Sequence, residues 1–273
     1  MAPNSEIPWV DAWIRWERNS KQSNNEDDIT PESDNDSLPP PTECQTFSYK
    51  DISIQIDGYH VDSQQIWNST GLTLWRSSHY LCQFLVDRND LFLCSDANER
   101  CNTVGVTTTN KGQMNILEVG SGLGKCGILA HLLSKSNNIP TNTLLTDGDT
   151  DTLKQLRRNV QTNIPNDASI ECHQLLWGQE HAIQFLKRHT NERFDLIIGS
   201  DLLYVTSVIR PLFETVGELL QPNGVFVMAH CCRRVGNEVT LEEVLDVACE
   251  LGLDWVEELR NEEDIVLYSF RLK

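Results

Sequence analysis

Three glycines within five residues indicate a place in this sequence where the main chain, rather than side chains, contacts a ligand. The stretch NILEVGSGLGKCGILAH carries them at Gly120, Gly122 and Gly124, directly after a short apolar run. A glycine lets a ligand approach the backbone with no Cβ in the way, and it accepts left-handed dihedral angles at little cost. We therefore expect the turn after this apolar run to hold a small molecule.

The spacing of the glycines separates three kinds of ligand site. A phosphate loop of the form G-x-x-x-x-G-K-[ST] would need a glycine in place of Val119 and a hydroxyl residue in place of Cys126. The dinucleotide fingerprint G-x-G-x-x-G, counted from Gly120, would need its third glycine in place of Lys125. What remains is E-x-G-x-G-x-G. It begins at Glu118 and resembles motif I of the class I methyltransferases, which bind S-adenosylmethionine.

Residues that follow three later apolar runs extend this hypothesis. Asp147 ends the run in LLTDGD, where a carboxylate can accept hydrogen bonds from both ribose hydroxyls of the cofactor. Trp177 ends LLWG, where the adenine of this cofactor usually lies, although a buried tryptophan is as readily a core residue. In GSDLLYV, Ser200 precedes a D-x-x-Y motif made by Asp201 and Tyr204, next to the expected position of the transferred methyl group.

Each of these polar residues has a structural alternative. Asp201 would serve equally to cap a helix beginning near residue 205, and Tyr204 would serve as a core aromatic. A turn or cap role suits Asp149 better than Asp147. His230 and Arg233 in AHCCRR follow the fifth strand and face the same side of the sheet, but polar residues at strand ends are common.

The segments that must position these residues alternate regularly from residue 114 onward. Apolar strands such as NILEV, TLLTD, SIECHQLLW, FDLIIGS and GVFVMAH are each followed by an amphipathic helix. This alternation predicts an α/β, Rossmann-like doubly wound sheet of seven strands, mostly parallel and covered on both faces. LDWVEELR and DIVLYSFRLK follow with no helix between them, so we expect the last strand to pair antiparallel at or near the sheet edge. Ligands of such sheets bind at the carboxyl ends of the strands.

The chain divides into three parts by composition. Residues 1–45 carry ten Asp or Glu against three Lys or Arg, and we expect most of this tail to be disordered. Within it, Trp9, Trp13 and Trp16 share one face of a short predicted helix that either packs on the domain or binds a partner. The remaining parts are an N-terminal extension at 46–113 and the ligand-binding core at 114–273.

The extension should supply three elements. TFSYKDISIQIDGYHV predicts two short strands that turn at Asp57-Gly58, a common hairpin signal. GLTLWRSSHYLCQFLVDR predicts a helix from about Ser77, with Leu81 and Leu85 on one face. A polar, turn-rich linker follows from residue 95.

Composition excludes several classes of partner. The formal net charge of -18 and the isoelectric point near 4.7 argue against general affinity for nucleic acid or anionic lipid, and they suit a basic partner or simple solubility. No apolar run approaches the length of a membrane helix. The nine cysteines are odd in number and lack zinc-ligand spacing, so we expect reduced thiols, no metal, and a cytoplasmic protein that also enters the nucleus. A monomer is the default expectation.

Four pieces together, TGLTLW, LEVGSGLGKCGILA, LLWG and SDLLYV, resemble family 16 of the seven-β-strand methyltransferases, which are mostly protein-lysine methyltransferases. The resemblance covers roughly residues 46–273, and LTDGD followed by LRRNVQTN is especially similar to the calmodulin and elongation factor 2 branches. It implies S-adenosylmethionine as cofactor and a lysine of an intracellular protein, such as a translation factor, as substrate. It also implies that Trp75 lies against the cofactor and that Asp201 and Tyr204 line the lysine channel.

Two other functions remain open from the sequence. The family has histidine-modifying relatives, and many fungal and plant members carry a nicotinamide methyltransferase label. A small-molecule N-methyltransferase would need a closed apolar pocket, for which the hairpin could act as a lid. A catalytically silent domain that binds a partner through the tryptophan helix is the third reading, and the intact Asp201 and Tyr204 argue against it.

Overall fold

The computed structural model describes residues 38–63, 69–92, 112–189, 192–232, 239–262 and 264–273. Four sequence predictions fall outside these ranges. They are the disorder of the acidic tail before residue 38, the tryptophan helix within that tail, the linker at 95–111, and Arg233.

Seven strands form one sheet in the order β5-β4-β3-β6-β7-β9-β8. The five strands β5, β4, β3, β6 and β7 run parallel to one another, whereas β9 runs antiparallel to both β7 and β8. The expected Rossmann-like α/β sheet is therefore confirmed, and the last strand lies one place in from the edge. The strands span Met114–Glu118 (β3), Thr141–Asp147 (β4), Ile170–Gln174 (β5), Phe194–Ser200 (β6), Leu220–Cys231 (β7), Leu253–Arg260 (β8) and Ile265–Leu272 (β9).

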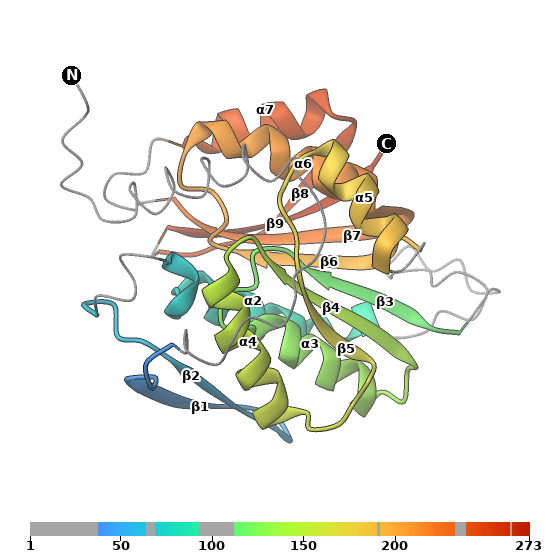
Figure 1. Ribbon diagram of the computed structural model, residues 1–273. Coiled ribbons are helices and arrows are strands. Elements are labelled where there is room, and N and C mark those ends of the chain that lie inside the picture. The colour runs from blue at the N-terminus through green and yellow to red at the C-terminus, as the bar shows by residue number, and fades with distance from the viewer. Residues whose placement is uncertain (1–37, 64–68, 93–111, 190–191, 233–238, 263) are drawn as a thin grey trace.

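Helices cover both faces of this sheet (Figure 1). On one face lie α2 (Ser77–Asp87), α3 (Lys125–Ser136) and α4 (Thr150–Asn163), together with a hairpin of two strands. On the other face lie α5 (Gln179–His189), α6 (Ile209–Leu219) and α7 (Leu241–Glu250). Within the described residues, short 3-10 helices span Thr70–Leu72 (η2), Asn89–Phe92 (η3) and Thr206–Val208 (η4). Across the described ranges, no helix combines the length and the apolar surface that a membrane crossing needs.

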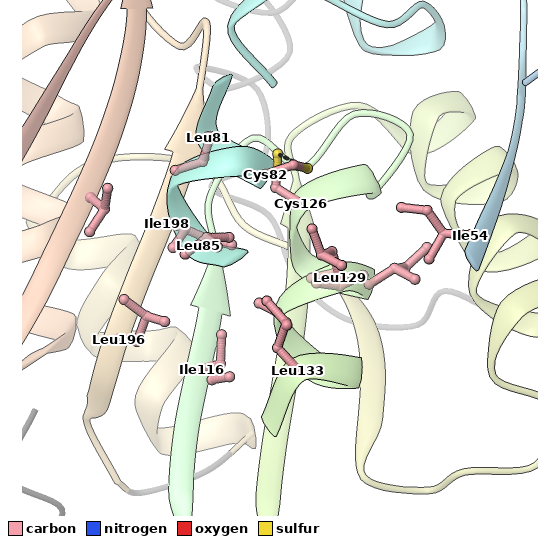
Figure 2. Packing of buried hydrophobic residues seen from close by; sticks show 14 of the residues in the cluster. Ile54, Leu81, Cys82, Leu85, Ile116, Cys126, Leu129, Leu133, Leu196 and Ile198 are labelled. Atoms are coloured by element: carbon pink, nitrogen blue, oxygen red, sulfur yellow. Dashed lines mark hydrogen bonds between the residues drawn. The ribbon is translucent and has the colours of Figure 1, made fainter. Parts of the chain in front are cut away.

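The core between α2, α3 and the sheet joins the N-terminal extension to the ligand-binding core. Neighbouring strand residues alternate between the two faces, so Ile116 packs toward α2 and α3 and Leu117 packs toward the opposite helices. Figure 2 shows Leu85 of α2 beside Ile198, and Leu129 of α3 in the same cluster on the side toward Ile54 of the hairpin. The extension is thus part of the main hydrophobic core rather than an appendage.

The hairpin differs from its sequence prediction. Its strands are β1 (Glu43–Tyr49) and β2 (Ile52–Gly58), and the chain turns at Lys50, which has a φ of 52°. The prediction of a turn at Asp57-Gly58 was wrong, because these residues end β2 and pair with the start of β1. Gly58 is needed for packing instead: a Cβ there would come within 2.4 Å of Leu123 Cδ1 in the glycine turn.

Two strand boundaries also shift. β5 ends at Gln174, so the segment through Trp177 is a loop rather than the end of a strand. β7 begins at Leu220, ahead of the predicted start at Gly224, because helix α6 passes directly into it. The prediction that an amphipathic helix follows each of these strands is confirmed by α3 to α7.

Truncation of Leu85 to alanine should test whether the extension shares one core with the sheet. Leu85 is fully buried, so we expect a loss of about 2–5 kcal/mol in the free energy of unfolding, in a single transition. Urea denaturation followed by circular dichroism measures it. Gln83→Ala, on the exposed face of the same helix, is the control and should change stability by no more than about 0.5 kcal/mol. Equal stability of the two variants would contradict a shared core.

Candidate active site

The glycine turn between β3 and α3 follows a backbone path that only glycine takes readily. Gly120, Gly122 and Gly124 have φ values of 58°, 53° and 83°, all in the left-handed region. A Cβ on Gly120 would lie 2.7 Å from Leu202 Cδ2 and 3.4 Å from the ring of Trp177. Gly120 therefore has no space for a side chain, and the turn lies close to the loops that follow β5 and β6.

Hydrogen bonds fasten this turn to the ends of β3 and β4. The backbone N–H of Ser121 donates to the Thr146 carbonyl oxygen over 2.8 Å, and the Ser121 hydroxyl donates to the Glu118 carbonyl oxygen over 3.1 Å. The Thr146 hydroxyl also donates to the Glu118 carbonyl oxygen, over 2.7 Å. The turn is thus held in one conformation from both of its flanking strands.

Asp147 lies beside the turn, as the ribose hypothesis requires. Its Oδ2 accepts the Gly122 N–H over 3.0 Å, and its Oδ1 accepts the Asp149 N–H over the same distance. Burial raises the pKa of the Asp147 carboxyl to about 6, while these backbone donors oppose the rise. Asp147 is therefore mainly a carboxylate at neutral pH. Asp149 caps helix α4 by accepting from the Thr152 N–H.

Glu118 lies beneath the turn rather than among the loops at the strand ends. The side chain is 2% exposed, and its Oε2 accepts the Gly127 N–H in the first turn of α3 over 3.1 Å. Burial raises the pKa of the Glu118 carboxyl to about 8. The contact observed for Glu118 is with helix α3, so its link to a cofactor passes through the turn that it supports.

Gly127 is a residue that the glycine spacing missed. Counted from Gly122, the series Gly122, Gly124 and Gly127 does satisfy G-x-G-x-x-G, so spacing alone does not exclude a dinucleotide. A Cβ on Gly127 would lie 2.1 Å from Leu145 Cδ2, which is the close helix-to-strand packing that the third glycine provides in that fingerprint. The sheet decides the matter, because antiparallel β9 departs from the parallel order of the dinucleotide fold.

Asp201 closes β6 and binds the start of α2. It is 4% exposed with a φ of 53°, and its own N–H donates to the Ala229 carbonyl oxygen over 2.9 Å. Its Oδ2 accepts the Ser77 N–H over 3.1 Å, and its Oδ1 accepts the Ser77 hydroxyl over 2.9 Å. Asp201 therefore does cap a helix, but the helix is α2, 124 positions earlier in the chain, and not one near residue 205.

The contact between Asp201 and Ser77 brings the aromatic residues together. Trp75 lies two residues before the start of α2, and the centre of its ring is 6.3 Å from that of Tyr204 in an edge-on arrangement. The Trp75 Nε1 donates to the Thr70 carbonyl oxygen over 2.9 Å. Ser77 was not singled out from the sequence, although a serine before an apolar helical run is a known start signal.

The remaining candidates fall at or near the same edge of the sheet. Ser200 ends β6 and pairs with Ala229 in β7, whereas His230 is buried inside β7 opposite Val266 of β9. Among the described residues, no three His, Cys, Asp or Glu side chains could hold a metal ion.

Comparison with known proteins assigns the chain to a family. A family model described as lysine methyltransferase matches residues 59–246. The chain belongs to this lysine methyltransferase family. The match runs from the end of the hairpin into α7, so it includes α2 as well as the glycine turn and the D-x-x-Y motif.

Three curated relatives show how far the similarity extends. Mouse protein N-lysine methyltransferase METTL21A is 32% identical over 193 residues, which is 69% of this chain and 70% of that protein. Yeast protein-lysine N-methyltransferase EFM3 is 26% identical over 157 residues, 56% of this chain and 41% of that protein. Calmodulin-lysine N-methyltransferase of Arabidopsis thaliana is 23% identical over 143 residues, 52% of this chain and 43% of that protein. The chain thus spans less than half of the latter two.

Membership of the lysine methyltransferase family identifies the reaction as methyl transfer and the cofactor as S-adenosylmethionine. The residues present fit this cofactor. The glycine turn presents bare main chain where a Cβ is excluded, and a half-buried carboxylate, Asp147, lies next to it. Trp177 contributes an aromatic edge 3.4 Å from the Cβ position of Gly120, on the adjoining loop.

Gly120→Arg should eliminate cofactor binding, because the new side chain would enter space shared by Leu202 and Trp177. Isothermal calorimetry with S-adenosylhomocysteine measures the affinity, and circular dichroism checks that the variant is folded. Gly217→Arg is the matched control, since a Cβ at Gly217 meets nothing within 4 Å. Unchanged affinity in folded Gly120→Arg would remove the glycine turn from the cofactor site.

The raised pKa of Glu118 predicts a pH dependence of stability. The pKa of the Glu118 carboxyl is 4.5 in the unfolded chain and about 8 in the folded protein, so the folded state binds more protons between these values. The stabilisation from protonated Glu118 is therefore complete below pH 4.5 and is lost as the pH rises through 8. The slope is at most about 1.4 kcal/mol per pH unit. Urea denaturation from pH 5 to pH 8.5 should show Glu118→Gln losing less stability than the unmodified protein. Parallel pH profiles would contradict the titration of Glu118.

Proposed function

We propose that this chain transfers a methyl group to a lysine side chain of another protein, and that the substrate is a translation factor. The observation that carries the proposal is the grouping of the Asp201 carboxylate with the rings of Tyr204 and Trp75 at the carboxyl end of β6. This group adjoins the glycine turn through Leu202, which packs against Gly120. LTDGD and LRRNVQTN are especially similar to the calmodulin and elongation factor 2 branches, and the second of these supports a translation factor as substrate.

In this proposal the cofactor lies along the carboxyl ends of β3 to β6. Gly120, Gly122 and Gly124 hold its methionine and ribose portions, and Asp147 accepts the ribose hydroxyls. A separate set of residues bounds the rest of the cofactor: Trp177 walls the adenine, and Trp75 and Ser200 lie toward the reactive end. Glu118 acts from below by keeping the turn in place.

Bound S-adenosylmethionine supplies an electrophilic methyl group on a sulfonium, so the protein has to align the nucleophile and keep it neutral. A lysine in water is protonated, with a pKa of about 10.4, and it must lose that proton before it reacts. Asp201 hydrogen-bonds the incoming amine and orients its lone pair. Because Ser77 holds both carboxylate oxygens, this acceptor is fixed before the substrate arrives.

The aromatic pair forms the wall of the lysine channel. The Tyr204 ring is half-buried and lies against Trp75, so one face of the channel is apolar and electron-rich. Such a ring favours a cationic ammonium or sulfonium by about 0.5–2 kcal/mol. The aliphatic stem of a lysine would pack on this wall while its amine reaches Asp201.

The partner, location and oligomeric state belong to the same proposal. The net charge of -18 suits a basic segment of a protein substrate, and it disfavours nucleic acid and anionic membranes. The odd cysteine count without metal-ligand spacing suits a reducing compartment, so we propose a cytoplasmic protein that also enters the nucleus. We propose that it acts as a monomer.

Asp201→Asn and Tyr204→Ala should separate catalysis from cofactor binding. The asparagine keeps one oxygen for Ser77 but loses the negative charge, and we expect turnover to fall roughly 100-fold or more with little change in affinity for S-adenosylhomocysteine. Tyr204→Phe should keep most activity, whereas Tyr204→Ala should not. Normal turnover in both Asp201→Asn and Tyr204→Ala would overturn the assignment of these residues.

Incubation of the protein with tritiated S-adenosylmethionine and a lysate from cells that lack its activity tests the substrate. A labelled protein band, absent with Asp201→Asn and traced by mass spectrometry to a lysine of a translation factor, is the expected result. Label confined to the small-molecule fraction would instead identify a small-molecule N-methyltransferase. Absence of label despite cofactor binding would identify a catalytically silent domain.

A further inference from the structure

Helix α4 takes the place of a strand along one edge of the hairpin. The side-chain amide of Asn163 accepts the Gln55 N–H over 2.7 Å and donates to the Gln55 carbonyl oxygen over 2.6 Å. The amide of Asn159 accepts the Asp57 N–H over 3.1 Å and donates to the Asp57 carbonyl oxygen over 3.0 Å. Each asparagine thus reproduces the donor and acceptor of a peptide group in a neighbouring strand.

The geometry of the two elements explains why this pairing works. Asn159 and Asn163 are one helical turn apart, about 6 Å along the helix axis, and they project from one face of α4. Gln55 and Asp57 are two residues apart in β2, about 6.6 Å along the strand. Figure 1 shows α4 lying alongside the hairpin over this stretch.

Asn159 makes two further hydrogen bonds that Asn163 does not share. Its Oδ1 accepts from Gln155 Nε2 over 3.3 Å, within α4, and its Nδ2 donates to the Leu123 carbonyl oxygen over 3.0 Å. Leu123 lies between Gly122 and Gly124. The second Nδ2 hydrogen bond of Asn163 goes instead to the Asn159 carbonyl oxygen. Asn159 is 1% exposed, so these bonds are shielded from water. A single buried amide therefore joins the hairpin to the glycine turn.

The surrounding contacts place the hairpin end directly over the glycine turn. Gly58 packs on Leu123, and the Tyr59 N–H donates to the Leu72 carbonyl oxygen over 2.9 Å. The next residue back in η2, Gly71, has its carbonyl oxygen 3.1 Å from the Cβ position of Gly122. The turn is thus enclosed between its supporting strand and helix on one side and the hairpin end with η2 on the other.

We propose that Asn159 is a positioning residue for the cofactor, and that it makes the N-terminal hairpin a working part of the cofactor site. By fixing the Leu123 carbonyl, Asn159 holds the peptide groups on either side and keeps the Gly122 N–H directed at Asp147. Loss of the amide would let the turn leave the conformation that the cofactor needs. The inference rests on the glycine turn being the cofactor site, and it does not depend on which substrate is methylated.

The matched pair Asn159→Leu and Asn163→Leu tests the proposal in the full chain. Each variant removes one amide from β2, but only the first removes the bond to Leu123. Calorimetry with S-adenosylhomocysteine should show the Kd rising about tenfold, equivalent to about 1.4 kcal/mol, in Asn159→Leu and staying close to the original value in Asn163→Leu. With saturating cofactor, kcat should be similar in both, so that the defect appears in the KM for S-adenosylmethionine.

Equal weakening of cofactor affinity in both variants would overturn the proposal, because it would show only a general loosening of the hairpin. Unchanged affinity in Asn159→Leu would overturn it as well. Asn159→Asp keeps the size of the side chain and the acceptor for the Asp57 N–H but removes the donors, and it should show the same rise in Kd if the leucine variant does not fold. A failure of the proposed substrate would leave these affinities untouched, because calorimetry is done without substrate.

Discussion

The main-chain path between β3 and α3 has no space for a side chain at its three glycine positions, and the candidate site is arranged about this constraint. Three alternate positions, Gly120, Gly122 and Gly124, lie in the left-handed region and bring bare backbone to the carboxyl ends of the strands. Glu118 and Gly127 allow α3 to lie close beneath the turn, and Asp147 takes up the N–H of Gly122 beside it. A turn so fully determined by its neighbours is pre-organised, which lowers the entropy cost of binding a ligand.

The N-terminal extension supplies part of the candidate site. Helix α2 shares the core of the sheet, and its first residue, Ser77, holds the carboxylate of Asp201. The same helix start carries Trp75 to Tyr204, and the hairpin end covers the glycine turn. The family match begins at residue 59, so η2 and α2 belong to the shared unit.

The proposed mechanism gives Asp201 both of the roles that the sequence analysis treated as alternatives. Asp201 caps helix α2, and in the proposal it also accepts a hydrogen bond from the incoming amine. A carboxylate offers about four acceptor positions, so hydrogen bonds from Ser77 do not prevent it from accepting another donor. Its left-handed backbone, with a φ of 53°, is a conformation that aspartate tolerates better than most residues, and it turns the chain sharply after β6.

The sequence by itself determined the alternation of strands and helices, the glycine turn and the residues that end β4 and β6, because periodicity and glycine spacing act over a few neighbouring residues. Tertiary structure alone decided which residues meet. Asp201 and Ser77 are 124 positions apart, and nothing local marks them as partners. Asp57-Gly58 has the local sequence of a hairpin turn, yet Gly58 lies at the end of a strand, where the absence of a Cβ leaves room for Leu123. Gly122, Gly124 and Gly127 have the spacing of a dinucleotide site, but the strand order of the sheet differs from that of the dinucleotide fold. A local sequence pattern is compatible with several structures, and packing against residues far away in the chain decides which of them forms. The pattern itself does not identify those distant residues.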